Sequence, residues 1–154
     1  MQTQQLTLGR FIDLAIQMEK QAYDFYKGLE EMYKDNTDLA ECFVGIKEDE
    51  SKHVRILLKI KESLSDIRLL GSVPESAVQR IQNVLEYQEK TDFAALNDAD
   101  AILDAMRGME DLEFDVVMEF VDADEIDFEL TSEYLKNETI DHANRIFRAQ
   151  QCLD

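Results

Sequence analysis

The chain has 154 residues, which is the length of one domain, and its 34 acidic and 16 basic residues give a formal net charge of −18. A charge of that sign attracts cations and repels phosphate backbones and anionic membrane surfaces, so the composition argues against nucleic acid and membranes as partners. One proline, five glycines and no tryptophan favour an all-helical domain. No stretch reaches the roughly 18 apolar residues of a membrane span, and residues 1–10 lack the apolar run of a signal peptide, so we expect a soluble, cytoplasmic protein.

The first two predicted helices cover residues 7–34 and 38–65. In both, apolar residues recur in steps of three and four, which is the period of one helix face. Polar residues interrupt each apolar stripe: Glu19 in the first helix, and Glu50 and His53 in the second. Because Glu50 and His53 are three residues apart, their side chains are neighbours on one face. The short loop between the two helices implies that they are antiparallel.

Residues 66–97 form the weakest part of the pattern. A break at residues 71–74 precedes a short apolar periodicity, which predicts one short helix inside a long connection. About thirty residues are too many for a plain loop between helices of a compact domain, so we expect this segment to cross over along the bundle.

The last two predicted helices cover residues 98–122 and 126–151. Glu110 and Glu113 lie on the apolar stripe of the former, and His142 lies on that of the latter. The predicted fold is therefore all-α: an antiparallel four-helix bundle in one domain that spans the whole chain, with a long crossover between its second and third helices.

Every predicted helix thus carries Glu or His near the middle of its core-facing stripe. Antiparallel packing brings these middles to one level, so the side chains should converge in one buried layer. Carboxylates at that density repel each other strongly in a low-dielectric interior, and divalent cations relieve the repulsion. Carboxylate oxygens with one imidazole per metal suit iron or manganese better than zinc. Taken singly, each residue has a plainer explanation, so the prediction rests on the coincidence of all four helices.

These residues resemble the ferritin-like superfamily and, within it, the rubrerythrins, along roughly residues 8–152. Glu110-x-x-Glu113 is the mark that favours rubrerythrin over ferritin. The resemblance implies a non-haem centre of two iron ions, or of another divalent metal such as manganese or zinc, with Glu50 as a bridging carboxylate. The ligand set that it implies comprises the carboxylates of Glu19, Glu50, Glu110 and Glu113 and the imidazoles of His53 and His142.

The fourth helix departs from the family's pattern. The second Glu-x-x-His should have Glu where this chain has Thr139, and Glu138 stands one residue earlier. A helix turns about 100° per residue, so Glu138 points away from the expected direction, although its spacing of four residues from His142 keeps it near that face. Either Glu138 reaches the centre as a ligand, or one bridging carboxylate is missing and the second metal is weakly bound or absent.

Three further side chains bear on the chemistry. Tyr26 follows Glu19 on the first helix and either donates a hydrogen bond to a ligand carboxylate or is an ordinary core residue. Cys42 and Cys152 form no Cys-x-x-Cys pair, so nothing indicates a zinc ribbon, a rubredoxin-type iron site or a disulfide scaffold, and we expect free thiols. The C-terminal Cys-x-x-Cys iron domain of the rubrerythrins has no counterpart in these residues, so the electron donor should be a separate protein.

The resemblance implies an oxidoreductase that reduces peroxide or dioxygen with electrons from that donor protein. Relatives commonly pair, which implies a homodimer. Two alternatives stay open because of Thr139. One is a protein that binds iron or another divalent metal without turnover, and the other is a helical scaffold with a degraded metal centre.

Overall fold

The computed structural model describes residues 6–92, 95–96, 98–122 and 129–153 of the chain. For residues 113–139 the description covers at most the backbone. Within these bounds the secondary structure consists of six α-helices and one isolated β-bridge. Each of the helices so described is too short or too polar to be a candidate for a membrane span.

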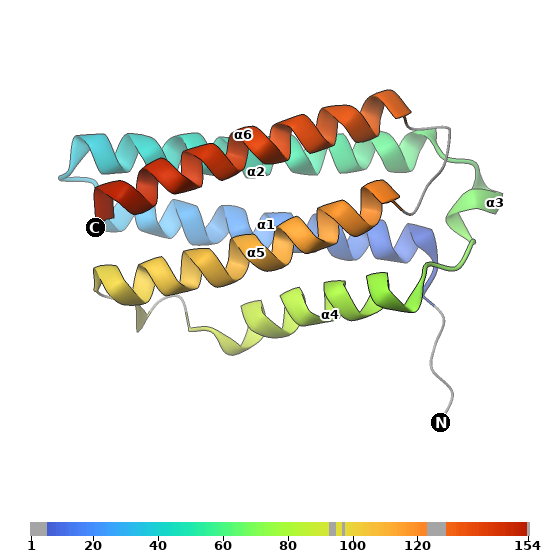
Figure 1. Ribbon diagram of the computed structural model, residues 1–154, viewed down its shortest axis with the longest axis horizontal. Coiled ribbons are helices and arrows are strands. Elements are labelled where there is room, and N and C mark those ends of the chain that lie inside the picture. The colour runs from blue at the N-terminus through green and yellow to red at the C-terminus, as the bar shows by residue number, and fades with distance from the viewer. Residues whose placement is uncertain (1–5, 93–94, 97, 123–128, 154) are drawn as a thin grey trace.

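Four of the helices form an antiparallel bundle (Figure 1). They are α1 (Leu8–Met32), α2 (Thr37–Ser63), α5 (Ala99–Asp122) and α6 (Glu129–Leu153). Helix α1 packs against α2, α2 against α6 and α6 against α5, and α1 also touches α5. The predicted all-α four-helix bundle is confirmed, with α5 and α6 as its third and fourth helices.

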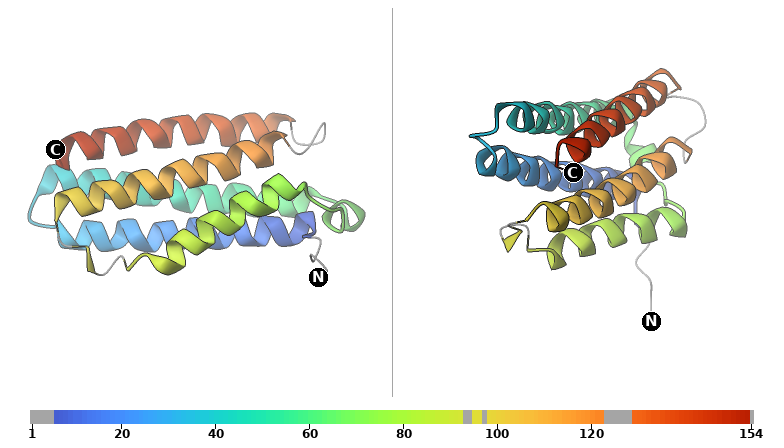
Figure 2. Two further views of the ribbon diagram at one scale, coloured as in Figure 1. Left: turned by 60° about the horizontal axis from the view of Figure 1, so that its bottom comes forward. Right: turned by 60° about the vertical axis from the view of Figure 1, so that its left-hand side comes forward.

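The crossover between α2 and α5 contains two helices, α3 (Asp66–Leu69) and α4 (Glu75–Lys90), where the sequence predicted one short helix. Helix α4 runs back along the bundle and packs against α5 and α1 (Figure 2). It starts directly after Pro74, whose restricted backbone suits a helix start. Its buried face is apolar at helical spacing and comprises Ala77, Ile81 and Val84. Burial of this face against the bundle explains why the helix is longer than its sequence pattern alone indicated.

Side-chain caps set where α1 and α2 begin. The hydroxyl of Thr7 accepts a hydrogen bond from the backbone N–H of Arg10 at 3.1 Å. The side-chain oxygen of Asn36 accepts one from the backbone N–H of Leu39 at 3.3 Å. Both bonds satisfy N–H groups that the first turn of a helix leaves without a partner. These helix starts determine the level at which the polar residues of α1 and α2 enter the bundle.

Apolar side chains fill the bundle in two clusters. One joins the first half of α1 to the second half of α2 and to α4, and the other joins the remaining halves of α1 and α2 to α5 and α6. On α1 the first cluster stops at Met18 and the second begins at Ala22, and on α2 the gap lies between Ile46 and Ile56. The buried residues inside these gaps are polar: Glu19, Asp49, Glu50 and His53. A layer of ionisable side chains therefore separates the two apolar clusters.

Candidate metal centre

Five of the predicted site residues lie in this polar layer, and each bundle helix contributes at least one. They are Glu19 from α1, Glu50 and His53 from α2, Glu110 from α5 and His142 from α6. All are buried except Glu110, whose side chain is 15% exposed. Burial of so many ionisable groups is unfavourable unless they neutralise one another or bind a cation.

The first group of donor atoms comes from Glu19, Glu50 and His53. Nδ1 of His53 lies 3.3 Å from Oε2 of Glu19 and 3.8 Å from Oε2 of Glu50. One potential ligand atom from each residue lies within 4.8 Å of those of the other two. This spacing allows all three side chains to bind one ion.

The second group comes from Glu50, Glu110 and His142. Nε2 of His142 lies 2.7 Å from Oε1 of Glu50 and 2.9 Å from Oε2 of Glu110. Glu50 thus belongs to both groups, because its Oε2 faces His53 while its Oε1 faces His142. The two groups of donor atoms therefore adjoin each other across one carboxylate.

Several buried atoms of the layer make no hydrogen bond of acceptable geometry to a described residue, although oppositely charged groups lie close to some of them. These atoms are both carboxylate oxygens of Glu50, Nε2 of His53 and Nε2 of His142. A buried polar atom without a partner costs about 1–3 kcal/mol. Two of these atoms lie on the His53 side and two on the His142 side, and carboxylate oxygens and imidazole nitrogens are donors that iron and manganese accept. The side chains present therefore fit a divalent metal ion.

Burial and neighbouring charges shift the pKa values of the layer. Burial, helped by the charge of Glu50, raises the pKa of Glu19 to about 8. Burial alone would lower the pKa of His53, but the carboxylates of Glu19 and Glu50 outweigh it and raise that pKa to about 10. Burial alone would raise the pKa of Glu50, but the charge of His142 and the closeness of Glu19 and His53 hold it below its usual range. A cation must displace the protons of Glu19 and His53, so metal binding here is coupled to proton release.

Tyr26 contacts the centre directly. Its side chain is fully buried, and its hydroxyl donates a hydrogen bond of 2.6 Å to Oε1 of Glu110. Of the two interpretations that the sequence allowed, the hydrogen-bond donor to a candidate ligand carboxylate is the one the structure shows. The bond orients the carboxylate of Glu110, whose other oxygen faces His142.

Asp49 is a site residue that the sequence analysis missed. It is buried, its Oδ2 lies 3.2 Å from Nδ1 of His142, and its Oδ1 accepts a hydrogen bond from Arg145. Burial alone would raise the pKa of Asp49, but its bonds to His142 and Arg145 lower it. The signal that the sequence offered is that Asp49 directly precedes Glu50. Successive side chains on a helix point about 100° apart, and this rotation turns Asp49 toward the adjacent helix α6. A carboxylate in this position orients an imidazole for metal binding.

Three predicted residues lie outside the described side chains. Glu113 belongs to α5, and Glu138 and Thr139 belong to α6. Only the helical backbone is described at these positions.

Comparison with known protein families gave one match. The family model described as Rubrerythrin matches residues 10–125. The matched stretch includes Glu19, Glu50, His53 and Glu110, whereas His142 lies beyond it on α6. No match was found among curated proteins or among solved structures.

Proposed function

We propose a function from the premise that this chain belongs to the rubrerythrin family of di-iron carboxylate proteins. The proposed activity is that of a non-haem di-iron oxidoreductase, which reduces peroxide or dioxygen with electrons from a separate donor protein. When bound, the iron pair supplies the electrons that pass to the oxidant. The protein side chains hold that pair, orient its ligands and keep bulk water away from it.

The position of Glu50 carries this proposal. Its two carboxylate oxygens face different groups of donor atoms, one with His53 and the other with His142, and none of its surface is exposed. A single metal ion would need only one of these groups. A carboxylate buried between two groups supports two ions that share it.

The proposed ligands include residues from every helix of the bundle. Glu113 shares a helix face with Glu110 because they are three residues apart, and Glu138 is four residues from His142. We assign both to the ligand set by this spacing, with Glu138 in place of the carboxylate that Thr139 lacks. The full proposed set is Glu19, Glu50, His53, Glu110, Glu113, Glu138 and His142.

Residues around the ligands have supporting roles. Tyr26 holds the carboxylate of Glu110 through its hydroxyl. Asp49, itself held by Arg145, orients the ring of His142. The apolar clusters on either side of the layer exclude bulk water, which strengthens every charge interaction between the ligands and a metal ion.

Metal content and reactivity test the proposal in one sample. Protein is loaded with ferrous iron without oxygen, its iron per chain is measured, and absorbance is followed after peroxide is added. We expect two irons per chain and a new ferric absorption band. The variant Glu50→Gln should lose at least one iron and the band, while Glu48→Gln, at an exposed position of the same helix, should retain both. One iron or none in the unaltered chain, without a spectral change, would refute the di-iron activity.

Metal binding without turnover is the second candidate function. The observation that favours it is Thr139, which replaces a carboxylate that the family's pattern places on the fourth helix. In the same experiment this function predicts bound ferrous iron that peroxide does not oxidise rapidly. A scaffold without a metal centre predicts no bound iron and a melting temperature that does not depend on metal.

A further inference from the structure

Two thiols from distant parts of the sequence lie at the same end of the bundle, where α2 begins and α6 ends (Figure 1). Cys42 lies in the second turn of α2 and is half-buried, and Cys152 lies in the last turn of α6 and is exposed. We propose that this pair is a modification site, at which peroxide forms a reversible disulfide between Cys42 and Cys152. The inference does not depend on the proposed function, because thiol oxidation needs no metal.

The packing of α2 against α6 places the two thiols together. The helices are antiparallel neighbours (Figure 1). Asp49 lies beside His142, and Gly45 lies beside Arg145. Continuing this register, Cys42 lies level with the turn that precedes Cys152. Side chains on a helix lean toward its N-terminus, so in an antiparallel pair these two lean toward each other. The presence of Cys152 also raises the pKa of the Cys42 thiol, which is consistent with that arrangement.

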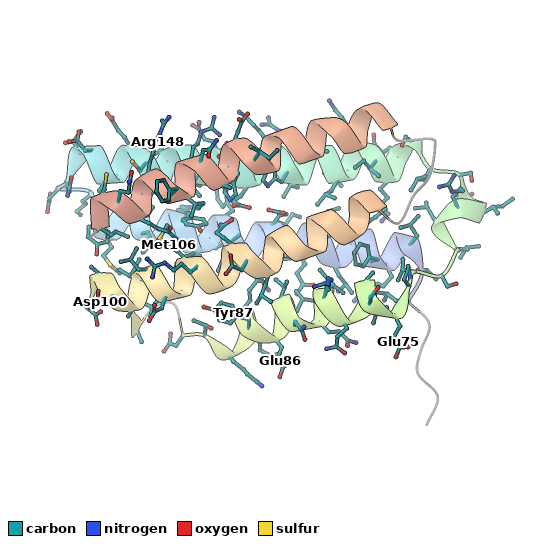
Figure 3. All side chains as sticks on the ribbon, viewed as in Figure 1. Glu75, Glu86, Tyr87, Asp100, Met106 and Arg148 are labelled. Carbon is teal, nitrogen blue, oxygen red and sulfur yellow. The ribbon has the colours of Figure 1, made fainter. Side chains whose placement is uncertain are left out.

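The surroundings give the two thiols different roles. Cys42 lines a pocket together with Gly45, Arg145 and Arg148, the last of which is labelled on α6 in Figure 3. Burial raises the pKa of the Cys42 thiol, and its contact with Cys152 raises it further, although Arg148 acts in the opposite direction. The thiolate is the reactive form, so Cys42 is the less reactive member of the pair. The exposed thiol of Cys152 therefore meets the oxidant first.

The chemistry requires one peroxide for each pair. The sulfur of Cys152 attacks hydrogen peroxide, the O–O bond breaks, and a sulfenic acid and one water form. The sulfur of Cys42 then attacks that sulfur, the S–S bond forms, the S–O bond breaks and a second water leaves. Two thiols lose two electrons and one peroxide becomes two waters. An external dithiol restores both thiols by exchange.

The disulfide would act on the helix that carries part of the metal centre. Helix α6 supplies His142 and Arg145, and its last turn contains Cys152. A covalent link between that turn and α2 closes a long loop of chain, which restricts the unfolded ensemble. The oxidised protein should therefore unfold at a higher denaturant concentration than the reduced protein.

The test uses the full chain, reduced and freed of metal so that no iron consumes the oxidant. One equivalent of hydrogen peroxide is added, the remaining thiols are counted in denaturant, and the mass and the linked peptides are determined. We expect both thiols to be lost, with a monomer lighter by two hydrogen atoms and full recovery of the thiols with dithiothreitol. The yield of the disulfide within one chain should be lower when the same protein is oxidised in denaturant, because the fold no longer holds the sulfurs together.

Two serine variants separate the roles of the thiols. Cys152→Ser should keep its remaining thiol for longer than Cys42→Ser, because the thiol of Cys42 is the more buried. Neither variant should gain stability on oxidation. The proposal is overturned by any of three results in the unaltered chain: both thiols persist, Cys152 is oxidised while Cys42 stays reduced, or the disulfides link separate chains.

Discussion

Nδ1 of His142 lies 3.2 Å from Oδ2 of Asp49, so an imidazole on α6 pairs with a buried carboxylate on α2. If Nδ1 keeps its proton for this bond, Nε2 is the nitrogen left to bind a metal. Nε2 is also the atom that faces Glu50 and Glu110. The pairing therefore selects which ring nitrogen can be a ligand.

Replacement of Asp49 by Ala should weaken metal binding. The variant removes the acceptor that orients His142, and losses of this kind typically lower metal affinity about 10–100-fold. Competition with a chelator for ferrous iron measures the affinity. The control is Asp141→Ala, which removes an exposed carboxylate next to His142 in sequence and should leave the affinity unchanged. Equal affinities for the two variants would contradict the role given to Asp49.

Replacement of Tyr26 by Phe should destabilise the protein by about 1–3 kcal/mol, because the buried carboxylate of Glu110 loses a hydrogen bond to a fully buried hydroxyl. Denaturant unfolding of the metal-free protein measures this loss. Tyr33→Phe is the matched control, since Tyr33 packs beside Phe43 on the edge of the apolar cluster and is only partly buried. A Tyr26 variant as stable as the control would show that the bond contributes nothing.

The stability of the metal-free protein should fall as the pH rises. The pKa of Glu19 is raised from 4.5 to about 8 and that of His53 from 6.5 to about 10. A group whose pKa is higher in the folded state stabilises that state below its unfolded pKa, and the contribution disappears as the pH passes the folded value. The loss should therefore extend from about pH 5 to about pH 10.

Denaturant unfolding at several pH values, with a chelator present, measures this dependence. The variant Glu19→Gln removes one of the two groups and should flatten the profile below pH 8. Metal-loaded protein should show the opposite slope over the same range, because protons compete with the cation for its ligands. If the stability of the metal-free protein rises with pH over this range, the raised pKa values of Glu19 and His53 are contradicted.

Two glycines on bundle helices should respond differently to alanine. A Cβ atom at Gly28 would meet nothing within 4 Å, so Gly28→Ala should stabilise α1 by about 1 kcal/mol. A Cβ atom at Gly108 would lie 2.6 Å from the hydroxyl oxygen of Tyr87, a residue of α4 labelled in Figure 3. That ring must then move and give up its 3.2 Å hydrogen bond to the backbone carbonyl of Ala105. Thermal unfolding should show a higher melting temperature for Gly28→Ala and no increase for Gly108→Ala.

The helices and the polar layer could be predicted from the sequence because both depend on local spacing. An amphipathic period shows which face of each helix is buried, and Glu19, Glu50 and His142 stand on that face. Antiparallel packing then leaves only one level at which the middles of four helices can meet. No knowledge of side-chain contacts was needed for that step.

The sequence pattern could not predict the contacts between helices. The role of Asp49 depends on the rotation of α2 relative to α6, and helical spacing within α2 does not determine that rotation. The length of α4 depends on burial against α5 and α1 rather than on its own propensity. The proposed pairing of Cys42 with Cys152 likewise depends on the register of two helices distant in sequence.

The polar layer between the two apolar clusters also bears on how long the folded chain survives. Without a cation, this layer reduces the stability that the clusters provide, because it buries mutually repelling carboxylates. A ligand at a hundredfold excess over its dissociation constant adds about 2.7 kcal/mol to the free energy of unfolding. Proteases degrade the unfolded fraction, and that fraction falls as bound metal increases. The abundance of this protein in a cell should therefore follow the supply of its metal, even at a constant rate of synthesis.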